Sequence, residues 1–208
     1  MRLISNSFKN NEVIPGEFAF CIPNDRGHVC LGSNRNPHLH WDDVPAGTQS
    51  FAIICHDPDV PSKPDDVNQE GKTVPASLPR IDFFHWVLVD IPKDVREIPA
   101  GTLSSEVTPK GKPGPQTPIG GAHGINDYTA WFSGDAEMKG NYFGYDGPCP
   151  PWNDSIWHQY IFTIYALDTP SLALGGTFDG KTALAALQRH ILGNAQIMGR
   201  YTLNPELG

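Results

Sequence analysis

The amino-acid sequence predicts a mainly β fold with few short helices. Its 208 residues include 21 Gly and 20 Pro, together about a fifth of the chain, against an average of roughly 12%. So many chain-reversing positions are atypical of a helical bundle or a coiled coil. Ten Phe, six Tyr and five Trp provide core material, so the excess of Gly and Pro does not indicate disorder. The length suits one domain, which we expect to span residues 1–208.

The longest apolar runs predict the strands of a central sheet. They are Gln49–His56, Phe83–Ile91 and His158–Asp168. The first run is too apolar to alternate, which is typical of a strand covered on both faces. The second and third runs end before Pro92 and Pro170, because proline has no N–H to donate to a strand ladder. Two shorter segments predict further strands, Gly16–Phe20 and Gly199–Leu203.

One helix has a clear signature, over Thr182–Leu192. Apolar residues recur there at i, i+3, i+7 and i+8 from Leu184, which is the spacing of one helix face. Asp179 lies upstream as a candidate cap, and Gly193 lies where a helix commonly ends. A weaker pattern predicts a short helix over Asn126–Phe132.

Two long polar stretches rich in Pro and Gly separate these elements. They are Ser62–Arg80 and Thr102–Gly124. Ordered loops of this length are uncommon and often functional. We expect both to pack on the sheet, because their prolines lower the entropy cost of ordering them.

The charge balance excludes several classes of partner. The chain has 15 Lys and Arg against 23 Asp and Glu, a net charge of −8. Nucleic acids and anionic membrane surfaces both require basic patches, so neither is an expected partner. No run approaches the ~20 apolar residues of a membrane span, and residues 1–6 lack the apolar core of a secretory signal. We therefore expect a cytoplasmic protein that does not insert into membranes.

The cysteines form no CxxC pair. Cys55 lies in an apolar run, which predicts a buried thiol. Cys21 and Cys30 flank a turn-like segment and could face each other across a hairpin, but a reducing compartment favours free thiols. Cys149, between prolines, is expected to be structural.

Polar residues at strand ends are the candidates for a binding site. Asp57 and Asp59 follow the first apolar run directly, and His85 lies within the second. Alternation along a strand places His158 and Tyr160 on one face, where an imidazole and a phenol can both donate to one oxyanion.

A glycine-proline loop precedes that strand. Gly147, before Pro148, permits a close backbone approach and offers its N–H as a third donor.

Each of these residues also has a purely structural interpretation. A histidine inside an apolar strand, such as His85, is by itself more often a satisfied core residue. Asp57 and Asp59 flank a proline and, by themselves, are more often turn acceptors that bond their own backbone. A site is favoured because three such places occur in one chain: the Asp57–Asp59 segment, His85, and the Gly147 loop with the strand that begins at His158.

That combination resembles the phosphatidylethanolamine-binding protein family, in its bacterial and archaeal branch often labelled Raf-kinase-inhibitor-like. The resemblance extends from about Leu3 to Leu203. The matching segments are Asn36–Gly47, Asp57–Pro61, His85–Pro92, Gly144–Pro151 and His158–Asp168.

The resemblance implies a β-sandwich with a central antiparallel sheet and a small anion pocket at one end of it. The pocket and its motifs correspond here to Asp57, Asp59, His85, Gly147, Pro148, His158 and Tyr160. Family members bind phosphate-like groups, including phospholipid head groups, and several inhibit kinases or proteases. Bacterial members often form homodimers. The resemblance thus implies a binding protein for a phosphate-like anion, with no cofactor and no resident metal.

Two features depart from the family pattern. Gln159 stands where the family usually has Arg, so a basic residue beside the pocket is lost. Residues Ser62–Asp82 form a longer connection than in many bacterial members, and the start of this connection is acidic.

Two other functions could use the same pocket. In a hydrolase, a histidine would act as general base, but no Gly-x-Ser-x-Gly nucleophile motif is present. In a metal site Asp57, Asp59, His85 and His158 are all suitable ligand types, but they contain no closely spaced histidine pair. We favour binding over catalysis.

The pocket prediction is specific. Asp57, His85, His158 and Tyr160 should converge on one cavity, with the Gly147 N–H pointing into it. Asp57 should accept a bond from one of the two histidines and fix its tautomer. Binding should weaken as pH rises through about 6.5, the pKa of an unperturbed histidine, or somewhat higher beside Asp57.

The resemblance also leads us to expect a cis peptide at Val60–Pro61.

Overall fold

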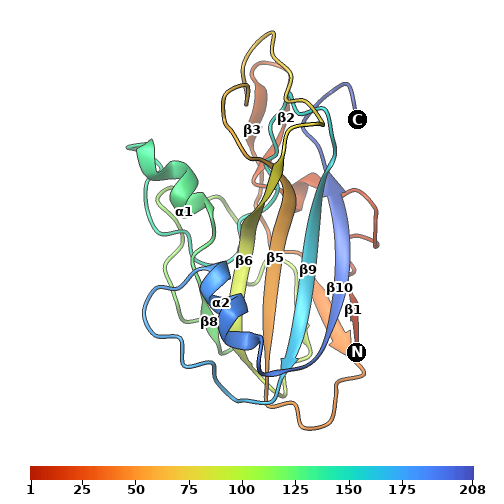
Figure 1. Ribbon diagram of the computed structural model, residues 1–208, viewed down its shortest axis with the longest axis vertical. Coiled ribbons are helices and arrows are strands. Elements are labelled where there is room, and N and C mark those ends of the chain that lie inside the picture. Colours follow the sequence, from red (N-terminus) through yellow and green to blue (C-terminus); the bar gives the residue numbers. More distant parts are fainter.

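The computed structural model describes residues 1–208 and has the predicted mainly β architecture. Its centre is a five-stranded antiparallel sheet in the order β10-β9-β5-β6-β8 (Figure 1). The strands are β5 Ser50–Pro61, β6 Arg80–Pro92, β8 Ala122–His123, β9 His158–Leu167 and β10 Ile191–Tyr201. The three longest predicted strands are therefore confirmed, and β5 is the middle strand, as its unbroken apolar run predicted.

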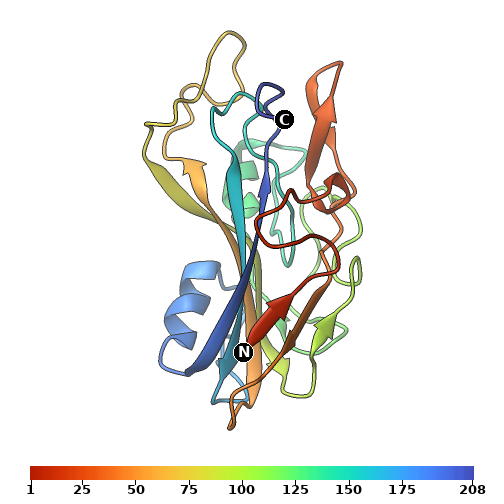
Figure 2. The ribbon, with the colours of Figure 1, turned by 90° about the vertical axis from the view of Figure 1, so that its right-hand side faces the viewer.

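A smaller sheet covers one face of the central sheet and completes the β-sandwich (Figure 2). It has the order β1-β4-β7, from Arg2–Ile4, Leu39–Asp42 and Glu97–Ile98. Trp41 of β4 and Phe51 of β5 are fully buried between the layers, with ring centroids 5.5 Å apart in an edge-to-face arrangement. The largest apolar cluster of the chain therefore lies between the two sheets.

Helix α2, Gly180–Leu187, covers the opposite face of the central sheet. The Asp179 side chain accepts a bond from the Thr182 N–H at 2.8 Å, which confirms the predicted cap. The predicted end at Leu192 is wrong. Ile191 instead begins β10 and pairs with Leu167, because backbone pairing with β9 continues over the length of the strand.

The predicted strand Gly16–Phe20 is also wrong. Residues Gly16–Phe18 form a 3₁₀ helix, η1, because Phe18 N bonds to Pro15 O and no neighbouring strand offers a ladder. The short hairpin β2 Cys21–Asn24 and β3 His28–Leu31 follows.

The weak helix pattern over Asn126–Phe132 corresponds to α1, Tyr128–Trp131, and the 3₁₀ helix η2, Phe132–Gly134. Neither α-helix has the length or the apolar composition of a membrane span.

The cysteine prediction needs one correction. Cys21 forms a disulfide with Cys149, 128 residues away in the sequence, and only Cys30 and Cys55 are free. Both Phe20 N and Cys21 N donate to the carbonyl of Pro148, which brings the glycine-proline loop against the hairpin. Cys30 is a free thiol, and in the hairpin its backbone lies opposite Ile22 and not opposite Cys21. Cys55 is buried, as expected, and burial raises the pKa of its thiol.

The Val60–Pro61 bond is trans, contrary to expectation, and the cis bond of the chain is Gly114–Pro115. Strand β5 reaches Pro61, which pairs with Arg80, so the extended backbone continues past Asp57. Two register shifts, between Cys55 and His56 and between Asp57 and Val60, interrupt the pairing of this strand end with β6.

The acidic loop between β5 and β6, residues 62–79, is held by Asn153 and not by the face of the central sheet. The side-chain amide of Asn153 donates to the carbonyls of Asp66, Gln69 and Lys72, and its oxygen accepts from Asn68 N. This loop therefore stands above the ends of the strands (Figure 1).

Candidate functional site

A cavity of about 710 Å³ lies at the end of the central sheet and is lined in part by residues of the β2–β3 hairpin, α1 and η2. Four side chains from three adjacent strands line it: Asp57 of β5, His85 of β6, and His158 and Tyr160 of β9. The predicted convergence is confirmed. It arises because β5 lies between β6 and β9, so the ends of the three apolar strands meet at one edge.

His158 is enclosed by two carboxylates. Its Nδ1 donates to Asp57 Oδ2 at 2.7 Å and its Nε2 donates to Asp154 Oδ2 at 3.1 Å, so both ring nitrogens carry protons. Burial alone lowers the pKa of this histidine, but the bonds to Asp154 and Asp57 raise it to about 9. Asp57 thus orients a histidine as predicted, and that histidine is an imidazolium with both its donors in use.

Arg80 completes this cluster from the start of β6. Its guanidinium binds both carboxylate oxygens of Asp154, at 2.6 and 3.0 Å. Burial raises the pKa of Asp154, but the bonds from His158 and Arg80 together hold it below its usual value. Two carboxylates, one imidazolium and one guanidinium make the cluster neutral overall.

His85 has a different environment, in which it is uncharged. Its Nδ1 lies 2.8 Å from the backbone oxygen of Asp146. A carbonyl only accepts, so Nδ1 carries the proton and Nε2 has a free lone pair. Burial lowers the pKa of His85 to about 4, although Asp57 opposes this. The expectation of a histidine pKa near 6.5 or somewhat higher beside Asp57 is therefore wrong for His85, whereas the pKa of His158 is raised beside Asp57 in the expected direction.

Tyr160 has a fully buried hydroxyl that makes no hydrogen bond of normal length and angle in the protein, although the Asp57 carboxylate lies close enough to raise its pKa. Its ring meets that of His85 edge-on, with centroids 5.1 Å apart. Burial raises the pKa of the phenol well above 10, so it stays protonated. The floor of the cavity therefore presents one phenolic donor beside one imidazole lone pair.

The walls of the cavity are apolar and open at the surface. Of its 25 lining residues 14 are hydrophobic. Three of the six large hydrophobic residues that are exposed anywhere on the chain belong to it, namely Leu31, Ile81 and Trp131. A polar floor below apolar walls is the usual form of a small-molecule site.

Comparison with known proteins agrees with this architecture. The family model described as phosphatidylethanolamine-binding protein matches residues 4–202. The chain belongs to this family. The UPF0098 protein YbhB of Escherichia coli is 32% identical over 203 residues, which cover 97% of this chain and 100% of that protein. A UPF0098 protein of Methanothermobacter thermautotrophicus is 36% identical over 183 residues, covering 86% and 93%.

Two solved structures share the phosphatidylethanolamine-binding protein fold. E. coli YbcL, described as a new member of the mammalian family, has a TM-score of 0.68 at 26% identity and covers 97% of each chain. CT736 of Chlamydia trachomatis, described as a homolog, has a TM-score of 0.64 at 24% identity, with 96% of this chain and 95% of that chain covered.

Three of the predicted site residues do not line the cavity of this family member. The Gly147 N–H donates to Asn34 Oδ1 at 2.8 Å and does not point inward. Glycine is needed here because a Cβ would lie 2.1 Å from the carbonyl oxygen of Phe18. The Pro148 carbonyl accepts from the β2 segment, and Asp59 binds the backbone N–H of Gln159 through its carboxylate. All three position the chain around the cavity.

A buried carboxylate behind His85 was not among the residues predicted from the sequence. The carboxylate of Asp146 is fully buried and accepts from Asn34, Asn126 and Lys112, at 2.7, 2.8 and 2.6 Å. Burial raises the pKa of this carboxyl, with Lys112 opposing. Asp146 belongs to the glycine-proline motif, but nothing in the spacing identifies its three donors.

Arg80 and Asp154 were missed as well. Asp154 lies four residues before His158, which could have identified it, whereas the signal for Arg80 is only its place before the second apolar strand. No group of three or more His, Cys, Asp or Glu is arranged to hold a metal ion.

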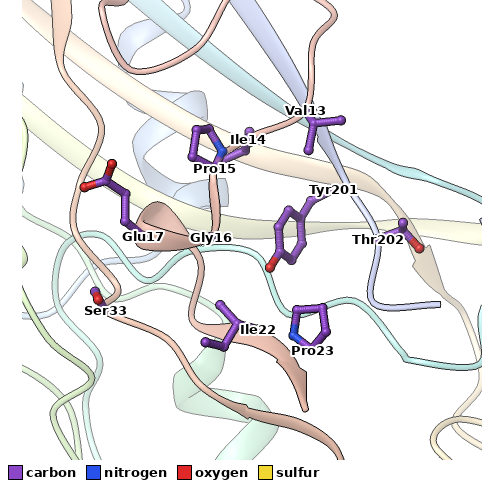
Figure 3. Close-up of a pocket in the computed structure, with 10 residues that line it drawn as sticks. All are labelled: Val13, Ile14, Pro15, Gly16, Glu17, Ile22, Pro23, Ser33, Tyr201 and Thr202. Carbon is purple, nitrogen blue, oxygen red and sulfur yellow. The ribbon is translucent and has the colours of Figure 1, made fainter. Parts of the chain in front are cut away.

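A second groove, of about 570 Å³, lies on another part of the surface, around Tyr201 (Figure 3). Val13 and Pro15 lie on one side of the Tyr201 ring and Pro23 on the other. Its Tyr201 and Glu17 side chains have their partners within the protein. The Tyr201 hydroxyl donates to Cys21 O at 3.0 Å, and Glu17, at the edge of the groove, pairs with Arg35 at 2.6 Å.

Proposed function

We propose that this protein binds a small molecule through a phosphoryl group, as a binding protein of the phosphatidylethanolamine-binding type, and does not catalyse a reaction. The phosphoryl group would lie on the floor formed by Asp57, His85 and Tyr160, and the remainder of the ligand along the apolar walls. A phosphoryl group is common to inorganic phosphate, phosphate esters and phospholipid head groups.

The unpartnered hydroxyl of Tyr160 carries the proposal. A buried polar group without a partner costs about 1–3 kcal/mol, and such groups are few in native proteins. An oxygen of a bound ligand would satisfy it. The Tyr201 hydroxyl, by contrast, already has its acceptor, and for this reason we place the ligand in the larger cavity.

The local donors matter because the long-range charge opposes an anion. The chain carries −8, and the cavity is lined by the carboxylates of Asp57, Asp82 and Asp127 against the cations His158 and Lys181. A preorganised donor is effective there because the surroundings exclude water and lower the local dielectric.

Isothermal titration calorimetry with phosphoethanolamine and with inorganic phosphate tests the proposal. Tyr160→Phe removes only the hydroxyl. A hydrogen bond to a charged group contributes about 1.5–3 kcal/mol, so affinity should fall roughly 10- to 150-fold. The fold should be unaffected, because the hydroxyl has no partner in the protein.

Tyr201→Phe is the matched control, since it removes a buried hydroxyl from the other groove. It should leave affinity unchanged. Binding that is equally tight in Tyr160→Phe, or that is lost only in Tyr201→Phe, would contradict the proposed site. If neither phosphoethanolamine nor inorganic phosphate binds at millimolar concentration, the proposed function is contradicted.

A further inference from the structure

We propose that the cavity accepts a phosphoryl group only together with a hydrogen, held between a ligand oxygen and His85 Nε2. The preferred ligand class is then the protonated phosphate monoester, ahead of the dianion and of phosphate diesters. This inference rests on the proposed function and specifies the protonation state of the group that the site takes.

Most hydrogen-bond donors around the cavity already have partners in the protein. Both N–H groups of His158 are bonded to carboxylates, and the N–H of His85 is bonded to the Asp146 carbonyl. The Gly147 N–H is bonded to Asn34. Of the groups predicted to donate to an anion, only the Tyr160 hydroxyl remains free.

The groups beside the Tyr160 hydroxyl are hydrogen-bond acceptors. His85 Nε2 has a lone pair and no partner in the protein, and Asp57 is a carboxylate that already accepts from Asp59 N and His158. A fully ionised phosphate has only acceptor oxygens. On the floor formed by Asp57, His85 and Tyr160 it would place lone pairs against lone pairs except at Tyr160, whereas a P–OH group donates to Nε2.

The tautomer of His85 is fixed by the backbone carbonyl of Asp146. The Asp146 backbone that receives Nδ1–H belongs to a residue whose carboxylate is held by Asn34, Asn126 and Lys112. To present an N–H at Nε2 while remaining neutral, His85 would have to give up its bond to this anchored carbonyl. The free lone pair is therefore a property of the fold and not of one rotamer.

The groups that face His85 do not stabilise a second proton in the free protein. Burial disfavours the charged ring most strongly. Asp57 from β5 and the backbone carbonyls of Asp146 and Gly147 favour the charged ring, the His158 imidazolium from β9 disfavours it, and the net effect keeps the ring neutral. The other neighbours are the uncharged rings of Phe83, Tyr128 and Tyr160.

The complex therefore contains one hydrogen that a bound dianion does not bring. Whether the ligand oxygen or Nε2 holds it, binding of the dianion takes up one proton. The second pKa of a phosphate monoester is about 6, so affinity should fall about tenfold per pH unit above pH 7.

Calorimetry with methyl phosphate and dimethyl phosphate tests this inference on the unmodified protein. At pH 5 both carry one negative charge and differ in the P–OH hydrogen. We expect methyl phosphate to bind at least about tenfold more tightly. Between pH 7 and 8.5 its affinity should fall with a slope of about one. Titrations at pH 8 in buffers of different ionisation enthalpy should report uptake of about one proton per ligand.

His85→Gln provides a second measurement, because the Gln amide can donate where Nε2 cannot. Its preference for methyl over dimethyl phosphate should fall to about threefold or less. Equal affinity of the unmodified protein for both esters, without proton uptake, overturns the inference and leaves the proposed function intact. Equal binding of ethanolamine, which supplies hydrogens without phosphate, also overturns it. If neither ester binds, the proposed function fails first.

Discussion

The charged state of His158 leads to a prediction about stability. The ring lies between Asp57 and Asp154 and is fully buried, and these contacts raise its pKa to about 9 from an ordinary 6.5. A histidine whose folded pKa is raised stabilises the fold fully below its unfolded pKa. That contribution is lost as pH rises through the folded value.

The size of this stabilisation follows from the difference between the pKa of His158 in the folded and in the unfolded protein. Each pH unit between them corresponds to about 1.4 kcal/mol, so the protonated ring contributes roughly 3 kcal/mol at pH 6 and less than about 1 kcal/mol at pH 9. His85 does not interfere in this window, because burial keeps it neutral in the folded state, with a pKa of about 4.

The perturbation is His158→Asn, assayed by urea unfolding at pH 6, 7, 8 and 9. The free energy of unfolding of the unmodified protein should exceed that of the variant most at pH 6. The difference should shrink by about 3 kcal/mol towards pH 9. His190→Asn removes the exposed pair of His190 with Asp168. It is the matched control, because surface pairs contribute little.

A difference between the unmodified protein and His158→Asn that is constant from pH 6 to 9 would refute the reasoning. Because this variant leaves two buried carboxylates without their partner, it could fail to fold. A nitrogen-detected NMR titration of the unmodified protein then decides the matter. A His158 ring that loses its proton near pH 6.5 would show that the two carboxylates do not hold it as an imidazolium.

Three further substitutions test the fold around the cavity. Cys149→Ser opens a bond to Cys21 that closes 128 residues, for which chain entropy gives a loss of up to about 5 kcal/mol in unfolding free energy; an unchanged urea midpoint would contradict the disulfide. Gly147→Ala should destabilise the protein by several kcal/mol, about 3 or more, because its Cβ would lie 2.1 Å from Phe18 O. Full stability with impaired ligand binding would instead assign Gly147 to the site. Asp179→Ala should cost about 1 kcal/mol in thermal unfolding as a lost helix cap, and no shift in melting temperature would count against the cap.

The sequence by itself determined the strands that form the centre of the fold. Runs such as Phe83–Ile91 are apolar on both faces, and this property is local and readable without a partner. The order of the motifs also predicted which strand ends carry Asp57, His85, His158 and Tyr160. The same local reasoning failed at Ile191 and Leu192, whose helical spacing was genuine but whose backbone pairs with β9.

The tertiary structure alone decided what the site can do. Whether His85 and His158 donate or accept depends on which atoms face each ring nitrogen, and those atoms come from other parts of the chain. One ring meets two carboxylates and is charged, whereas the other meets a carbonyl in a buried position and is neutral. Their residue type is identical, and hydrogen-bond partners distant in sequence set the difference. For the same reason the pairing of Cys21 with Cys149 could not be deduced from cysteine spacing, because only the folded chain brings the glycine-proline loop against the hairpin.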